Sequence, residues 1–254
     1  MNKKKKLAII LGTTIPLFFI LLFVSIPVIY VSDYYHADEE AIEAFVKDYD
    51  IERKELNKNL TAFIPDTYEH GFIFYPGGKV ESTAYEPLMY DLASKGILCV
   101  LVKMPFNLAI LDVNRADDVF GYFPNVESWH IGGHSLGGTV ASMYLEEHSD
   151  KFVGLVLLAS YSTTNITNKN LRVLTLVGSE DKVLSKDKYE KNVHNLTPNL
   201  YEYTLTGGCH AYFGMYGKQK GDGTPTISPK DQILLTSSLI RRFIYQEGLM
   251  KPHN

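Results

Sequence analysis

The stretch IGGHSLGGTV, residues 131–140, places Ser135 between two glycines, Gly133 and Gly137, each two positions away. Apolar residues precede it, and a run with helical spacing follows it. In a nucleophile elbow, a serine occupies a sharp turn between a strand and a helix, and its neighbours at these two positions must be small. The stretch therefore predicts a strand, a tight turn with Ser135 at its apex, and a helix.

Apolar runs alternate with helical segments over most of the remaining chain. Most of these runs are continuously apolar, as expected for strands of a parallel sheet that is covered by helices on both faces. The pattern predicts an α/β fold with a mostly parallel, doubly wound sheet. The strand candidates are residues 71–76, 96–102, 128–134, 152–160, 171–178 and 200–207, and the helix candidates are residues 84–95, 107–123, 137–149, 186–195 and 229–248.

The N-terminal segment has the features of a membrane anchor. Residues 7–31 carry no charge and follow the cluster Lys3–Lys6. At about 1.5 Å per residue, such a helix crosses a hydrocarbon core of about 30 Å. We therefore expect residues 1–32 to hold a transmembrane helix in the cell membrane, with the lysines in the cytoplasm and the following domain outside it. A cleaved signal peptide is the alternative, although IPVIYVSDYY (26–35) lacks a small-x-small cleavage site.

The rest of the chain divides into a predicted helical linker, residues 33–58, and one domain, residues 59–254. After residue 32 the chain carries 21 basic and 29 acidic residues, which argues against a nucleic-acid surface. The two cysteines, Cys99 and Cys209, form neither a disulfide framework nor a zinc site. Because the chain has no phosphate-binding loop, no dinucleotide fingerprint and no metal-ligand spacing, we predict no cofactor. The sequence does not determine the oligomeric state.

A serine hydroxyl becomes a useful nucleophile only when a base takes its proton. In this architecture an acid and then a histidine follow the serine, each after a later strand. Asp181 follows the strand candidate 171–178, and His210 follows the candidate 200–207. We therefore predict a triad of Ser135, Asp181 and His210. The alternatives are Glu180 as the acid and His194 as the base, while His134 is expected to pack beside the serine.

Attack on a carbonyl also creates an oxyanion, which needs backbone N–H donors. One donor is expected from Leu136, directly after the serine, and the second from a loop after an earlier strand. The stretch FIFYPGGKV (72–80) supplies such a loop, and we predict the second donor to be Gly78. By itself, Pro-Gly-Gly is also compatible with an ordinary turn.

Several longer stretches resemble the alpha/beta-hydrolase superfamily, and more narrowly the bacterial alpha/beta hydrolase fold-5 family. The matching stretches extend over about residues 70–245, and they are FIFYPGGKVESTAYEPLMYDLASKGI, LVKMPFNLAIL, IGGHSLGG, LVGSEDKV and GGCHAYFGMYGKQKGDGTPTIS. The resemblance implies the alpha/beta-hydrolase fold, Ser135 as nucleophile, Asp181 as acid, His210 as base, and an oxyanion loop at 77–78. Members of the family more often have Asn where this chain has Cys209.

These observations lead to an expected function. We expect a membrane-anchored serine hydrolase that cleaves an ester or related acyl bond of a small-molecule or lipid-like substrate through an acyl-enzyme. The superfamily includes esterases, lipases, thioesterases and peptidases, so the resemblance does not select a substrate. Amide or peptide cleavage is one alternative, and a non-catalytic anchored binding protein on the same fold is another.

Overall fold

The computed structural model describes residue 23 and residues 25–248. The chain divides into two units, Met1–Tyr34 and Tyr35–Asn254. In the first unit, residues 25–32 are helical. Most of the segment predicted to span a membrane, residues 7–31, lies outside the described residues. Across the described part of the chain, no helix combines the length and the apolar character that a membrane span requires.

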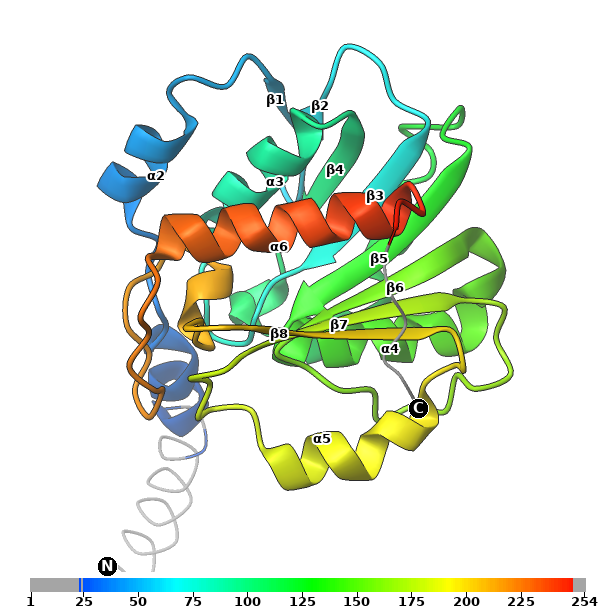
Figure 1. Cartoon of the computed structure of the whole chain (residues 1–254). Helices are drawn as coiled ribbons and strands as arrows, with labels where there is room; N and C mark the ends of the chain where they lie inside the picture. The colour runs from blue at the N-terminus through cyan, green and yellow to red at the C-terminus, as the bar shows by residue number, and fades with distance from the viewer. Residues whose placement is uncertain (1–22, 24, 249–254) are drawn as a thin grey trace, which may run out of the picture. The chain divides into compact units, whose positions relative to one another are not determined.

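The second unit contains an eight-stranded sheet with the strand order β1-β2-β4-β3-β5-β6-β7-β8 (Figure 1). The pairs β1–β2 and β2–β4 are antiparallel, and all other neighbouring strands are parallel. The strands are β1 (Glu52–Asn57), β2 (Leu60–Ile64), β3 (His70–Tyr75), β4 (Ile97–Val102), β5 (Ser128–His134), β6 (Phe152–Leu158), β7 (Arg172–Gly178) and β8 (Leu200–Leu205).

Helices cover both faces of the sheet, which explains the continuously apolar strands. Successive side chains of a strand point to opposite faces. In β3, Phe72 and Phe74 pack into a cluster with α3 (Glu86–Ala93) and α6 (Pro229–Ile244), whereas Ile73 and Tyr75 pack into a second cluster with α4 (Leu136–His148). In Figure 1, α3 and α6 lie in front of the sheet and α4 lies behind it. The predicted α/β architecture is confirmed.

Local signals explain where several helices begin. Helix α6 begins with a capping box between Ser228 and Asp231, with Pro229 at its first position. Asp38 caps α2 by accepting a hydrogen bond from Ala41 N–H. The α-helices are α2 (Glu39–Val46), α3 (Glu86–Ala93), α4 (Leu136–His148), α5 (Lys186–Asn192) and α6 (Pro229–Ile244). The 3₁₀ turns are η1 (Ser82–Tyr85), η2 (Pro105–Asn107), η3 (Ala109–Leu111), η4 (Val113–Asp118), η5 (Ser149–Lys151), η6 (Val193–Asn195) and η7 (Ala211–Phe213).

Two parts of the sequence-based prediction need correction. The helical linker predicted for residues 33–58 is helical only at Glu39–Val46, and Glu52–Asn57 forms edge strand β1 of the sheet. The helix predicted for residues 107–123 is instead a series of 3₁₀ turns. A regular helix is interrupted at its start because Phe106 and Asn107 both have positive φ, 51° and 55°.

Candidate active site

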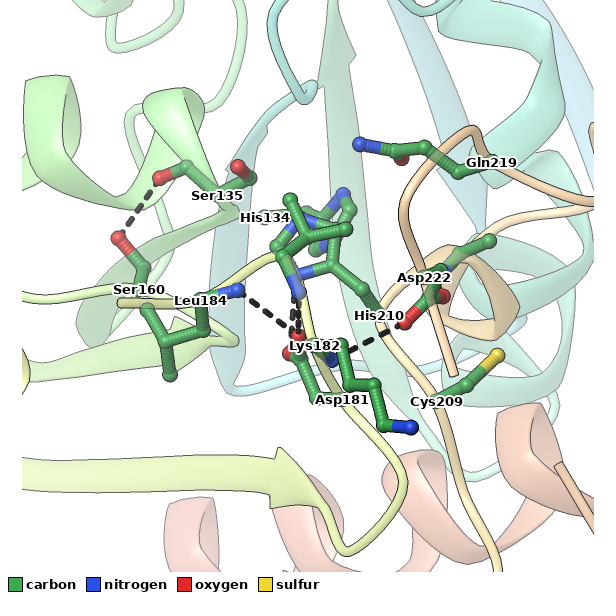
Figure 2. Close-up of polar contacts among 12 residues, drawn as sticks. His134, Ser135, Ser160, Asp181, Lys182, Leu184, Cys209, His210, Gln219 and Asp222 are labelled. Atoms are coloured by element: carbon green, nitrogen blue, oxygen red, sulfur yellow. Dashed lines mark hydrogen bonds and ion pairs between the residues drawn. The ribbon is translucent and has the colours of Figure 1, made fainter. Parts of the chain in front are cut away.

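Ser135 lies in the turn between β5 and α4, with φ 51° and ψ −122°. Residues other than glycine rarely adopt a positive φ, and such strained positions cluster at functional sites. The end of strand β6 and the residues that follow it hold this turn through two hydrogen bonds. Ser135 N–H donates to Leu158 O at 2.9 Å, and Ser160 Oγ donates to Ser135 O at 2.7 Å (Figure 2). The predicted strand–turn–helix geometry of the elbow is therefore present.

The positions of Gly133 and Gly137 have no room for a side chain. A Cβ on Gly133 would lie 2.5 Å from the carbonyl carbon of Gly137. A Cβ on Gly137 would lie 2.1 Å from Tyr75 O and 2.3 Å from Pro76 O, at the end of β3. These atoms belong to the backbone and cannot rotate away. The elbow thus closes against the end of β3 only because both positions lack a side chain.

The structure brings Asp181 and His210 together. Asp181 follows β7, His210 follows β8, and Asp181 Oδ2 lies 2.8 Å from His210 Nδ1 (Figure 2). Both side chains are only 1% exposed. The other carboxylate oxygen, Oδ1, accepts the N–H groups of Val183 and Leu184, each at 2.8 Å. These two bonds fix the carboxylate so that Oδ2 faces the imidazole.

The alternative acid and base lie elsewhere. Glu180 accepts a hydrogen bond from Ser179 Oγ at an exposed position. His194 lies exposed in the turn η6. The geometry therefore favours Asp181 and His210 as the acid–base pair.

Ser135 and His210 line one pocket of about 260 Å³ at the carboxyl ends of the parallel strands. Among the described residues, His210 Nε2 is buried and has no hydrogen-bond partner. Buried ring nitrogens are normally paired, and catalytic hydrogen bonds often tighten only when substrate binds. The structure thus brings Ser135 and His210 to one pocket without a hydrogen bond between Ser135 Oγ and His210 Nε2. The pocket is lined by Ser135, Leu136, Thr139, Ala159, Ser160, Tyr161, Val183, Leu184, Ser185, Lys188 and His210.

A larger concavity, of about 830 Å³, includes Ser128 and Phe152 at the amino ends of β5 and β6. It contains neither the elbow serine nor the Asp181–His210 pair. Ligands of open α/β sheets bind at the carboxyl ends of the strands. We therefore assign the chemistry to the smaller pocket.

The two predicted oxyanion donors belong to neighbouring residues. A Cβ on Gly78 would lie 2.8 Å from Leu136 Cδ2 and 3.2 Å from Leu136 Cβ, so the loop after β3 packs directly on the residue after the serine. Gly77 N–H donates to Tyr85 Oη at 3.1 Å. This bond engages the neighbouring amide, which leaves Gly78 as the better candidate in the loop.

His134 packs between the elbow and the base, as its position in the sequence suggests. Its ring centroid lies 4.6 Å from that of His210, and its Nδ1 lies 2.8 Å from Tyr85 Oη. Burial, together with the adjacent imidazole of His210, holds the pKa of His134 well below its ordinary value. His134 is therefore uncharged at neutral pH.

Cys209 is part of the structural support beneath the base. Its N–H donates to Gln232 Oε1 at 2.9 Å, and its carbonyl accepts from Gln232 Nε2 at 2.8 Å. Burial raises the pKa of the Cys209 thiol to about 12, so the thiol stays protonated.

The sequence analysis did not assign three supporting residues: Ser160 behind the elbow, Tyr85 at the end of η1, and Asp222. Tyr85 accepts a hydrogen bond from Gly77 N–H, and Asp222 contacts the loops of both Asp181 and His210. Asp222 and Tyr85 had a signal in the sequence, because each lies within a family-like stretch, GGCHAYFGMYGKQKGDGTPTIS and FIFYPGGKVESTAYEPLMYDLASKGI.

The model of the alpha/beta hydrolase family matches residues 71–234, well over half of the chain. This chain belongs to the alpha/beta hydrolase family. Membership of the family supports hydrolytic chemistry in general. No curated protein matches the sequence significantly.

Solved structures share the fold of this alpha/beta hydrolase at low sequence identity. One is described as a predicted CIB-like hydrolase from Thermoplasma acidophilum, with a TM-score of 0.55, 15% identity, and coverage of 76% of this chain and 98% of the other. Another is Est1E from Butyrivibrio proteoclasticus, with a TM-score of 0.54, 13% identity, and coverage of 77% and 98%. At such identities the likeness shows the fold alone.

Proposed function

We propose that this alpha/beta hydrolase is a serine hydrolase that cleaves an ester or related acyl bond. Ser135 is the nucleophile, His210 the general base, and Asp181 the carboxylate that orients the base. The observation that carries the proposal is the buried 2.8 Å contact between Asp181 Oδ2 and His210 Nδ1. We infer from this contact that His210 carries its proton on Nδ1, so that Nε2 can accept another.

The reaction then proceeds through an acyl-enzyme. Ser135 Oγ attacks the carbonyl carbon while His210 Nε2 takes the hydroxyl proton, and Asp181 stabilises the imidazolium. The oxyanion accepts hydrogen bonds from the N–H groups of Gly78 and Leu136. The intermediate expels the alcohol, which takes the proton from His210. Water then attacks the acyl-enzyme by the same route and releases the acid.

The pocket supports a short acyl group. Its volume is about 260 Å³, and Leu136, Val183 and Leu184 provide its apolar side chains at the elbow and after β7. We expect kcat/KM for p-nitrophenyl esters to be highest between acetate and hexanoate. A steady rise to decanoate would instead indicate a lipid-like substrate. Comparison of an ester with its matched amide separates esterase from amidase or peptidase activity.

A fluorophosphonate probe tests the nucleophile, because only an activated serine reacts with it. The wild-type protein should be labelled and should hydrolyse p-nitrophenyl butyrate. Ser135→Ala should lose both properties with little change in Tm. His210→Ala should be nearly as damaging because the two residues act as a unit, whereas the exposed control His194→Ala should keep normal turnover. An unlabelled, inactive wild-type protein would instead support a non-catalytic binding protein.

We also propose that the N-terminal segment anchors this hydrolase in the cell membrane, with the catalytic domain outside the cytoplasm. The support is the uncharged run 7–31 after Lys3–Lys6. Protease added to spheroplasts should digest the domain while a cytoplasmic marker stays intact. Protection of the domain under conditions that digest an external control would contradict this orientation.

A further inference from the structure

Asp222 lies in the loop between η7 and α6, within the segment KGDG (220–223). Its Oδ2 accepts the N–H of Ala211 at 2.9 Å. Its Oδ1 accepts the N–H of Lys182 at 3.3 Å and that of Gly223 at 2.8 Å. Thus one carboxylate receives backbone donors from two loops that are distant in the sequence.

Both loops carry a residue of the acid–base pair. Ala211 directly follows His210, and Lys182 directly follows Asp181. Figure 2 shows Asp222 beside the loop of His210, with its bond to Lys182 next to the Asp181–His210 pair. We propose that Asp222 is a positioning residue that holds the loops of Asp181 and His210 at the separation their hydrogen bond requires. This inference rests on the proposed serine hydrolase mechanism.

The neighbouring glycine keeps this loop in place. A Cβ on Gly223 would lie 1.8 Å from Glu180 O, on the loop that carries Asp181. The KGDG segment therefore contacts the loop that carries Asp181 through its backbone as well as through the Asp222 side chain. Such close packing leaves the carboxylate little freedom to move away from its donors.

Asp222 needs both carboxylate oxygens for this role. Burial alone would raise its pKa, but hydrogen bonds, foremost those from the amides of Ala211 and Gly223, lower the pKa below its ordinary value. The side chain is thus an anion at neutral pH and accepts on both sides. In Asp222→Asn, one oxygen becomes an NH₂ group, which must face a backbone N–H and cannot accept from it.

The experiment separates positioning from stability. Asp222→Asn, Asp222→Ala and the wild type are titrated with a fluorophosphonate to count working sites, and kcat is expressed per titrated site. The matched control is Asp231→Asn. Asp231 lies in the first turn of α6 and also accepts hydrogen bonds, from Ser228 N–H and Oγ, but these bonds form the capping box of α6. Thermal melting is recorded for all four proteins.

We expect kcat per site to fall about 10- to 100-fold in both Asp222 variants, because sub-ångström errors in a catalytic pair are costly. KM should change less than about threefold, because Asp222 does not line the pocket. Asp231→Asn should lower only Tm. The inference is overturned if kcat per site stays within about threefold of wild type, or if Asp222→Asn shows no cooperative melting. Persistent labelling of Ser135→Ala would instead overturn the proposed mechanism itself.

Discussion

The stability of the fold should fall as the pH drops below about 6.5 because His130, on β5, is buried in its neutral form. Its side chain is fully buried, and Arg172 Nη2 lies 3.5 Å from its Nε2. Burial, and then the charge of Arg172, lower the pKa of His130 to about 3. In the unfolded chain a histidine titrates near about 6.5.

The sign and size of the effect follow from these two values. Because the pKa is lower in the fold, the unfolded chain binds the proton first as the pH falls. The contribution of a neutral His130 is therefore fully present above about pH 6.5 and is lost progressively down to about pH 3. At pH 5 the unfolded state gains about 2 kcal/mol from this group, or about 1.4 kcal/mol for each pH unit below 6.5.

Urea unfolding at pH 7 and pH 5 measures this contribution. Other groups also titrate in this range. The loss of unfolding free energy between pH 7 and pH 5 is therefore compared between wild type and His130→Gln, in which the side chain at position 130 cannot ionise. The loss should be smaller in the variant by about 2 kcal/mol. His194→Gln, at an exposed position, serves as the control. An equal loss in wild type and His130→Gln would refute the reasoning.

Two further substitutions test the site and the elbow. Asp181→Asn should lower kcat/KM by about 10³- to 10⁴-fold, because the wrong histidine tautomer is then favoured; Glu180→Gln, at the neighbouring carboxylate, should stay within about twofold, and the opposite order would exchange their roles. Gly137→Ala should destabilise the fold by about 1–3 kcal/mol in urea unfolding, because its Cβ meets Tyr75 O. Gly121→Ala should be nearly neutral, because no atom lies within 4 Å of the added Cβ. Equal losses of unfolding free energy in the two variants would show that the elbow shifts to accommodate the Cβ at position 137.

The sequence predicted the parallel part of the sheet because most of its strands are buried on both faces and are therefore continuously apolar. Edge strand β1 has the sequence ERKELN and is largely exposed, so it has no apolar signal. Its place in the sheet comes from antiparallel pairing with β2. A local pattern of charges around apolar residues instead favoured one long helix over 33–58.

The meeting of Asp181 with His210 could be anticipated because the carboxyl ends of parallel strands share one edge of the sheet. The hydrogen bonds that support the site from outside the Asp181–His210 pair could not be anticipated. Ser160 Oγ donates to Ser135 O between the loops that follow β6 and β5, and the carboxylate of Asp222 accepts hydrogen bonds from Ala211 N–H and Lys182 N–H. Although Asp222 lies in a family-like stretch, the partners of these hydrogen bonds depend on tertiary geometry, and neither spacing nor residue type reveals them.

Val183 and Leu184 each contribute to the site in two ways, one through the backbone and one through the side chain. Their amides hold Asp181 Oδ1, whereas their side chains line the pocket. Every residue except proline supplies the same amide. A mutant library at these two positions that omits proline can therefore vary the shape of the pocket while it retains the hydrogen bonds that orient the acid. Under the proposed mechanism, we expect point mutations at positions 183 and 184 to change substrate preference while the hydrogen bonds to Asp181 are retained.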